Sequence, residues 1–376
     1  MPFWSRRPPE EPPSWEELFP LEARLRSQLD DVLVVQDRRL VGRSLAFGGR
    51  LLVAPGEALE RLRPRLLPHG YTPFVREEGG IAWVQAIPYA EVAEPRRVGL
   101  HVALFLATVL TTLFSGALQA GVGPTDLWHH PARLLLGLPF SVSLLAILGV
   151  HEFGHYTLGR RRGIPVSLPY FIPVPPPFIA GTLGAVIRMS GPIRDRRALF
   201  DMAIAGPLAG LVVAIPVYVI GLKLSVVARI PGDSYVRLGD SILPKLIEWL
   251  TLGPLPPGHD VILHPVAFAG WFGFLVTALN LVPAGQLDGG HIVYAVFGAR
   301  HGLISKLAVA GLVLIGLAFS SVNWLLWAIL IVTLMGFQHT PTMDDITPLD
   351  ARRRALGLFT LALLLLLLPP VPISLG

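Results

Sequence analysis

The chain has 376 residues, 52% hydrophobic and only 15% charged, a composition that excludes an ordinary soluble domain and indicates a polytopic protein of the lipid bilayer. The formal net charge of +5 is interpreted as a guide to membrane orientation, and no nucleic-acid partner is predicted. Cysteine is absent, which excludes disulfides and thiolate metal sites, so any metal ion must be held by His, Asp or Glu.

The N-terminal part of the chain is more polar than the rest. Residues 1–13 are rich in proline and are predicted to be disordered, and they lack the apolar core of a secretory signal. Residues 14–95 predict a small soluble α+β domain. Its expected elements are a helix that opens on a capping box of Ser14 and Glu17, short β segments over 32–54, an amphipathic helix over 56–67 and a hairpin turning at Gly79–Gly80. No catalytic constellation is evident in this domain.

A transmembrane domain is predicted over residues 96–376, with a catalytic core at about 135–298. A bilayer span needs about 20 apolar residues. About seven transmembrane helices are predicted, at residues 98–120, 135–158, 198–222, 263–283, 303–319, 321–337 and 354–371. If these spans alternate, five clusters of basic residues fall on one side, which the positive-inside rule makes cytoplasmic. We therefore predict a multi-pass protein of the bacterial plasma (inner) membrane, with the N-terminal domain on the cytoplasmic side.

The stretch 164–192 is apolar but cannot be a simple span. It contains six prolines before Ala180, and a helix cannot run through them. Non-helical backbone at membrane depth must be buried in protein or line a wet cavity. We predict a re-entrant loop or β-hairpin here.

The sequence HEFGH in the second predicted span contains the first candidate site residues. His151 and His155 are four residues apart, so on a helix their side chains share one face and can bind one zinc ion. Glu152 can reach a metal-bound water without being a ligand itself, which suits a general base. Charged groups within a bilayer are costly, and Glu152 is the only glutamate between Glu94 and Glu248. Chance therefore explains this triplet poorly.

A third protein ligand must come from elsewhere, and the aspartates are the candidates. Asp195 lies in the sequence RDRR and is interpreted as a solvated ion pair, whereas Asp201 suits an acid near a helix N-terminus. Asp288 lies at the cytoplasmic end of the fourth span, at the depth of HEFGH, among glycines that allow close backbone approach. It is the strongest candidate for the third ligand.

These motifs resemble those of the site-2 protease family of intramembrane zinc metalloproteases. The segments that resemble motifs of this family are HEFGH from His151, NLVPAGQLDGG from Asn280, FDMAIAGPLAG from Phe200 and GTLGAVI from Gly181. The run from His264 to Ile292 is especially similar to the plant-plastid and cyanobacterial branch, and the 223–262 loop is too short for the PDZ domain of many bacterial members.

The resemblance implies a role for each matching residue. His151, His155 and Asp288 would hold one zinc ion, and Glu152 would be the general base. Asn280 would orient substrate or stabilise the oxyanion, although a buried interhelical hydrogen bond explains it as well. The fourth helix is expected to bend between Asn280 and Pro283. The small residues of the third span are attributed to packing alone. His291, three residues after Asp288, is interpreted as a cap or a solvated residue, with support of the metal ligands as the alternative.

The resulting prediction is a protease that cleaves transmembrane protein substrates within or near their membrane segments. The strand within residues 181–190 is hypothesised to pair with a locally extended substrate. The alternative is a zinc-binding membrane transporter or channel with ionisable residues along an ion path. Substrate identity and oligomeric state are left open.

Overall fold

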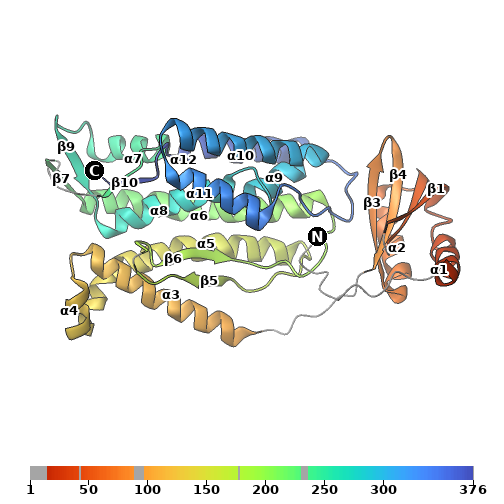
Figure 1. Ribbon diagram of the computed structural model, residues 1–376, viewed down its shortest axis with the longest axis horizontal. Coiled ribbons are helices and arrows are strands. Elements are labelled where there is room, and N and C mark those ends of the chain that lie inside the picture. Colours follow the sequence, from red (N-terminus) through yellow and green to blue (C-terminus); the bar gives the residue numbers. More distant parts are fainter. Residues whose placement is uncertain (1–14, 42–43, 89–96, 177, 230–235, 376) are drawn as a thin grey trace. The chain divides into compact units, whose positions relative to one another are not determined.

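The computed structural model describes residues 15–41, 44–88, 97–176, 178–229 and 236–375 (Figure 1). The predicted disorder of residues 1–13 and the capping residue Ser14 lie outside these ranges. The chain divides into two compact units. The N-terminal unit contains residues 1–95, 189–199 and 340–351, and the membrane unit contains residues 96–188, 200–339 and 352–376.

The N-terminal unit is an α+β domain with a four-stranded antiparallel sheet in the order β1-β2-β4-β3. Its elements are α1 (Trp15–Ser27), β1 (Leu33–Val41), β2 (Ser44–Leu51), α2 (Pro55–Leu66), the 3₁₀ turn η1 (Leu67–His69), β3 (Tyr71–Glu78) and β4 (Ile81–Pro88). Both Gly79 and Gly80 have positive φ angles, of 59° and 80°, at the predicted hairpin turn. The β3–β4 hairpin therefore turns where the sequence indicated.

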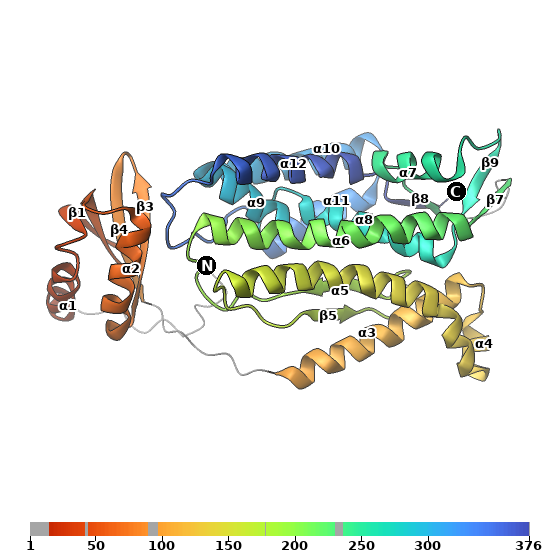
Figure 2. The same ribbon diagram turned by 180° about the vertical axis from the view of Figure 1, so that it is seen from behind.

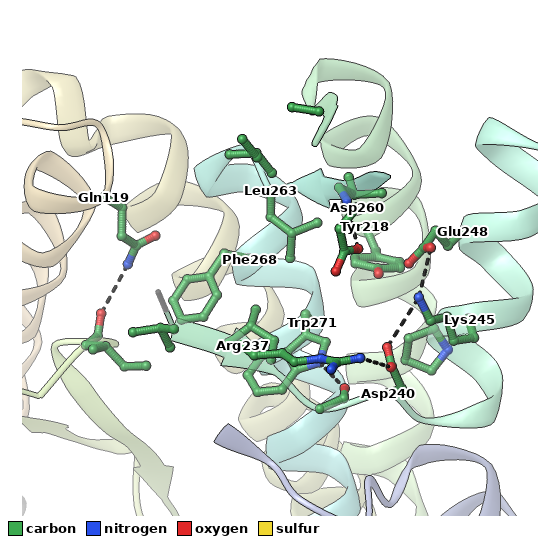
Figure 3. A pocket seen from close by; sticks show the side chains of 18 of the residues that line it. Gln119, Tyr218, Arg237, Asp240, Lys245, Glu248, Asp260, Leu263, Phe268 and Trp271 are labelled. Atoms are coloured by element: carbon green, nitrogen blue, oxygen red, sulfur yellow. Dashed lines mark hydrogen bonds and ion pairs between the residues drawn. The ribbon is translucent and has the colours of Figure 1, made fainter. Parts of the chain in front are cut away.

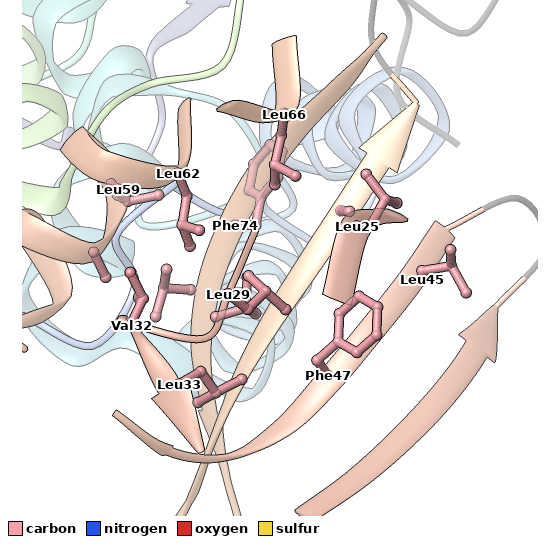
Figure 4. Close-up of a cluster of buried hydrophobic side chains, with 14 of the residues drawn as sticks. Leu25, Leu29, Val32, Leu33, Leu45, Phe47, Leu59, Leu62, Leu66 and Phe74 are labelled. Carbon is pink, nitrogen blue, oxygen red and sulfur yellow. The ribbon is translucent and has the colours of Figure 1, made fainter. Parts of the chain in front are cut away.

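One hydrophobic core holds this sheet to its helices. The buried side chains of α2 lie at i, i+1, i+4 and i+8 and form one apolar face. They pack with side chains from α1 and the strands, including Leu25, Phe47 and Phe74 (Figure 4). Burial of this face stabilises the unit by the hydrophobic effect.

Two segments from far along the chain extend the sheet at the outer edge of β3. The Val75 amide donates to the Met343 carbonyl at 2.7 Å, and the Asp345 amide donates to the Val75 carbonyl at 3.0 Å. The amides of residues 343 and 344 donate in turn to the carbonyls of Ile193 and Arg194, both at 2.8 Å. An edge strand that would otherwise expose unpaired backbone groups is thereby covered.

The membrane unit is predominantly helical. Its helices are α3 (Val98–Gln119), α4 (Pro124–His129), η2 (Pro131–Gly137), α5 (Leu138–Arg161), α6 (Arg196–Leu224, whose first residues belong to the N-terminal unit), α7 (Ile242–Leu252), α8 (Pro265–Leu281), α9 (Asp288–Phe297), η3 (Gly298–Arg300), α10 (His301–Ala318), α11 (Val322–Leu330), the π-helical turn η4 (Ile331–Met335) and α12 (Ala351–Leu367). A helix lies at each of the seven predicted spans.

Four helical stretches in the described part of the chain are long and apolar enough to cross a membrane. They are Val98–Gln119, Pro131–Arg161, Arg196–Leu224 and Asp288–Ala318, and Pro265–Leu281 and Val322–Met335 are shorter apolar helices. By length and composition the chain is thus an integral membrane protein, and the count of seven spans stays a prediction.

Three two-stranded antiparallel ribbons accompany these helices. β5 (Tyr170–Pro173) pairs with β6 (Thr182–Val186), β7 (Val226–Arg229) with β9 (His259–Ile262), and β8 (Val236–Leu238) with β10 (Ile373–Leu375). The β5–β6 hairpin occupies the proline-rich stretch, where a loop or hairpin was predicted. It lies between α3 and α5 (Figures 1 and 2).

Small residues let α5, α6 and α8 approach closely. A Cβ atom added at Gly154 of α5 would lie 2.7 Å from the Ala205 carbonyl oxygen of α6, and one at Gly270 of α8 would lie 2.7 Å from the Cα of Tyr218 in α6. The three helices run side by side (Figure 2). This packing brings the candidate site residues of α5 next to both neighbours.

Candidate metal centre

His151 and His155 occupy the same buried face of α5. Their exposed fractions are 3% and 4%, and the two Nε2 atoms lie 3.2 Å apart. The spacing of four residues accounts for this, because positions i and i+4 are neighbours on a helix. Two imidazole nitrogens therefore face one point inside the membrane unit.

Asp288 joins the two histidines from another helix. Its Oδ2 atom lies 3.3 Å from Nε2 of His151 and 3.2 Å from Nε2 of His155. The expected bend of the fourth helix is wrong in its detail: α8 ends at Leu281, and Asp288 is the first residue of α9. A Cβ at Gly289 would lie 2.1 Å from the Leu281 carbonyl oxygen, so only glycine permits this tight return.

The spacing of the three donor atoms fits a small tetrahedral metal ion. Zinc binds His nitrogen and carboxylate oxygen at about 2.0–2.1 Å, which places tetrahedral ligand atoms about 3.3 Å apart. The three pairs of atoms from His151, His155 and Asp288 are separated by 3.2, 3.2 and 3.3 Å. Together they are a group able to hold a metal ion.

Helix α6 orients the second histidine and leaves room beside it. His155 Nδ1 lies 2.8 Å from the Met202 carbonyl oxygen, an arrangement that leaves Nε2 for a metal. A Cβ atom at Gly206 would lie 2.0 Å from His155 Nε2, and one at Gly210 would lie 3.1 Å from His151 Nδ1. The attribution of these glycines to helix packing alone was incomplete, because they also make space for the imidazoles.

Glu152 lies next to the donors without being one of them. Its side chain is buried, with 5% of the residue exposed. Among the described residues, no hydrogen bond to its carboxylate is found, so the group is not engaged elsewhere. A buried carboxylate beside three atoms that could ligate a metal ion suits proton transfer.

Asn280 reaches the same group from α8. Its Nδ2 atom lies 3.3 Å from Nε2 of His151. This contact links α8 to α5 and places an amide at the edge of the donor set. Both roles considered for Asn280, substrate orientation and an interhelical hydrogen bond, are compatible with this position.

The other two aspartates are engaged in structural contacts. Asp195 accepts a hydrogen bond from the Ala198 amide at 2.8 Å and thus caps α6. Its carboxylate also lies 4.0 Å from the exposed Arg194 guanidinium, so the predicted ion pair is present beside the cap. Asp201 accepts two hydrogen bonds from Arg353, at 2.8 and 3.0 Å, and also contacts Arg162. It joins the ends of three helices instead of serving the dipole of one.

His291 is the residue that sequence reasoning misjudged. It is only 6% exposed, and its Nδ1 atom lies 2.6 Å from Nε2 of His339. His339 stacks on Tyr294 with ring centroids 4.2 Å apart, and His301 lies edge-on to His339 at 5.5 Å. The expectation of a cap or solvated residue is thus wrong. The distance of 48 residues to His339 left no local signal for this pairing.

Comparison with known families agrees with this geometry. Residues 139–322, which include all five predicted site residues, match the profile of Peptidase family M50. The chain therefore carries an M50 domain. M50 is the site-2 protease family, so the resemblance seen in the motifs is confirmed. The M50 domain also favours a zinc metalloprotease over the alternative of a transporter or channel.

Curated relatives of the chain are named as zinc metalloproteases. It is 33% identical over 247 residues to "Probable zinc metalloprotease EGY2, chloroplastic" of Arabidopsis thaliana, with 63% of this chain and 42% of the relative covered. It is 31% identical over 240 residues to "Probable zinc metalloprotease EGY1, chloroplastic" of the same plant, with 62% and 43% covered. It thus spans about two fifths of the length of these relatives.

The comparisons do not support the predicted bacterial membrane, and they provide no solved structure of a relative. The relatives are named as chloroplast proteins, so the prediction of a bacterial plasma membrane gains nothing from them. No solved structure matches the chain.

Proposed function

We propose that this chain is an intramembrane zinc metalloprotease that hydrolyses peptide bonds within or near transmembrane segments of membrane proteins. The observation that carries the proposal is the convergence of His151, His155 and Asp288 at tetrahedral spacing inside an M50 domain. Glu152 lies one residue from the first ligand. Catalysis resides in the transmembrane domain, since the N-terminal domain has no comparable group among its described residues.

Each residue has one task in this proposal. His151, His155 and Asp288 would hold a zinc ion, which would supply a Lewis acid able to polarise a carbonyl and acidify water. Glu152 takes a proton from the attacking water and passes it to the leaving amide nitrogen. Met202 fixes the direction of the His155 ring through its carbonyl. Asn280 donates toward the substrate carbonyl oxygen as negative charge develops on it.

The membrane arrangement follows from the charge pattern. In this proposal α8, the α11–η4 helix and α12 complete seven spans with the four long helical stretches, and the β5–β6 hairpin is re-entrant. The positive-inside rule then places the N-terminal unit and the metal-binding end on the cytoplasmic side. The bilayer delivers transmembrane substrates to the site by lateral diffusion.

The substrate must be extended before its backbone can be cut, and β6 can receive it. β6 pairs with β5 on one side only among the described strands, and Leu183 and Val186 are 61% and 51% exposed. A substrate strand pairing with this edge would regain backbone hydrogen bonds lost on unwinding. Proline substitutions along 183–189 should therefore reduce cleavage, and unchanged cleavage would exclude strand pairing.

The central experiment compares the purified chain with its Glu152→Gln form in liposomes that contain single-span substrates. Loss of the general base should lower kcat at least about 100-fold. Zinc content should stay at one ion per chain, whereas His151→Ala and Asp288→Ala should lose zinc. Val150→Ala, on the exposed face of the same helix, is the matched control. Equal cleavage by the parent and Glu152→Gln would refute the proposed protease function. Ion transport that is retained in Glu152→Gln would favour the alternative, a zinc-binding membrane transporter or channel.

A further inference from the structure

A cavity of about 460 Å³ lies in the membrane unit (Figure 3), and parts of α6 and α8 that are remote from the metal centre line it. The distance between the cavity and the metal centre follows from the rise along two helices, α6 and α8. Twelve residues of α6 separate Gly206, beside His155, from Tyr218 in the cavity wall. Twelve residues of α8 separate Asn280, beside His151, from Phe268 in the wall. At 1.5 Å per residue, both give about 18 Å.

The cavity has an aromatic wall that is fixed in place. Phe268 and Trp271 are nearly parallel, with an interplanar angle of 15° and ring centroids 6.0 Å apart. The Trp271 indole donates a hydrogen bond to the Gly239 carbonyl at 3.1 Å. The volume of the cavity lies in the range of ligand-binding pockets. Preformed apolar walls with a few polar groups are typical of such pockets.

Four of the six charged residues around the cavity pair with one another, and the other two, Arg229 and Asp260, carry opposite charges. The Lys245 ammonium lies 3.0 Å from a Glu248 oxygen and 3.3 Å from an Asp240 oxygen, and Arg237 approaches Asp240 at 3.6 Å (Figure 3). Burial opposes the charge on Lys245, but its hydrogen bond to Glu248 and the nearby carboxylates outweigh this effect and raise its pKa. With these charges paired in the wall, an apolar occupant is favoured over a strongly charged one.

Strand edges and the β5–β6 turn also line the cavity. β7, β8 and β9 each contribute residues to its wall, and each pairs with one neighbour only among the described strands. They can therefore offer backbone hydrogen bonds to an extended chain. Gln119 donates to the carbonyl of Ile179, in the turn before β6, and its Oε1 atom is buried without a partner. Both residues line the cavity, so it begins where the β5–β6 hairpin turns.

We propose that this cavity is an exosite that binds an extended, apolar peptide segment of the substrate, remote from the bond that is cut. The inference rests on the proposed function, because the occupant is part of the protease's substrate. A distance of 18 Å corresponds to about five or six extended residues, or to twelve helical ones. An extended substrate that follows β6 thus reaches the cavity about six residues from the scissile bond.

Steady-state kinetics with two substrates tests this assignment. One substrate contains the apolar segment six residues from the cleavage site, and the other has it replaced by Gly and Ser. Ala228→Trp and Ile262→Asp should raise KM for the first substrate about tenfold or more, with kcat and cleavage of the second unchanged. Leu250→Asp, on an α7 residue that is 67% exposed and does not line the cavity, is the control. Equal effects on both substrates would overturn the proposal.

Cross-linking provides a readout that does not depend on cleavage. A photoreactive residue placed at position 262 in the Glu152→Gln background should label the substrate about six residues from the scissile bond. Labelling about twelve residues away would instead mean a helical occupant, and labelling of lipid alone would mean a lipid pocket; either contradicts the assignment. If Glu152→Gln still cleaves the substrate, the proposed function fails. If the parent cleaves normally but the residue at position 262 does not label the substrate, only the exosite is refuted.

Discussion

The Nδ1 atom of His155 lies 2.8 Å from the carbonyl oxygen of Met202 on the neighbouring helix α6. Because a carbonyl can only accept, Nδ1 carries the proton and donates it. Nε2 then keeps its lone pair and faces Asp288 at 3.2 Å. The tautomer and direction of one imidazole of the proposed metal site are thus set by the backbone of the neighbouring helix α6.

Replacement of Gly206 by alanine should disrupt the metal centre. The added Cβ would lie 2.0 Å from His155 Nε2, so the imidazole must move away from the other two donors. We expect zinc affinity to fall about 10- to 100-fold, and cleavage with it. Gly149→Ala on α5, where an added Cβ has no atom within 4 Å, is the control. Titration with a zinc chelator measures both, and parental affinity in Gly206→Ala would contradict the prediction.

Asp201→Asn should destabilise the membrane unit. Asp201 is the shared partner of Arg353 and Arg162, and its side chain is 11% exposed. Loss of its charge removes this carboxylate from the partly buried Arg353 guanidinium and from the more exposed Arg162 guanidinium, so we expect the free energy of unfolding to fall by about 1–3 kcal/mol. Asp126→Asn, in an exposed pair with Arg133 at 3.2 Å, should change it by less than about 1 kcal/mol. Denaturant unfolding in detergent separates the two, and equal losses would exclude a special role for Asp201.

The stability of the N-terminal unit should depend on acid through Asp31. Hydrogen bonding from Arg65 holds the pKa of Asp31 below its usual range; partial desolvation opposes the shift and a further bond from Arg61 adds to it. The folded pKa is therefore lower than the unfolded value near 3.9, so the stabilisation is present above about pH 4 and is lost as the pH falls below it. Melting of the full chain between pH 5 and pH 2.5 should show this slope, and Asp31→Asn should flatten it. High salt should weaken the slope because the carboxylate is exposed; identical profiles for both forms would contradict the assignment.

The strand addition at β3 should be visible in hydrogen exchange. Val75→Pro removes the amide that donates to Met343, whereas Val75→Ala removes a similar buried side chain but keeps that amide. We expect faster exchange at residues 343–345 in the proline form than in the alanine form, measured by mass spectrometry on the full chain. If both forms protect 343–345 equally, the hydrogen bonds to β3 do not hold this segment.

Local periodicity and motif spacing predicted the elements of the chain well. The i, i+4 spacing of His151 and His155 implied a shared helix face, and the Gly79–Gly80 pair implied a hairpin. Asp288 was within reach of prediction because few other acids were available at the same depth. These inferences succeed because each depends on short-range geometry or on the cost of burying charge.

Contacts between distant segments could not be predicted in the same way. Nothing in the sequence near Gly206 shows that it faces His155, because this depends on how α5 and α6 pack. His291 appeared to be a terminal residue of a helix, whereas its partner His339 lies on a loop reached only after two further helices. The pairing of residues 343–345 with β3 likewise joins positions more than 260 residues apart.

The boundary between the two units of the chain falls within helix α6, close to the residue that orients His155. α6 runs without interruption from Arg196, yet residues up to Leu199 belong to the N-terminal unit and Met202 belongs to the membrane unit. Three residues of helix, about 4.5 Å, therefore separate Leu199, the last residue of α6 in the N-terminal unit, from Met202, whose carbonyl orients His155. Because a helix resists compression along its axis, a ligand or protein that displaces the first turn of α6 would change the direction of the His155 imidazole. In the proposed protease, such a ligand would alter cleavage without entering the active site.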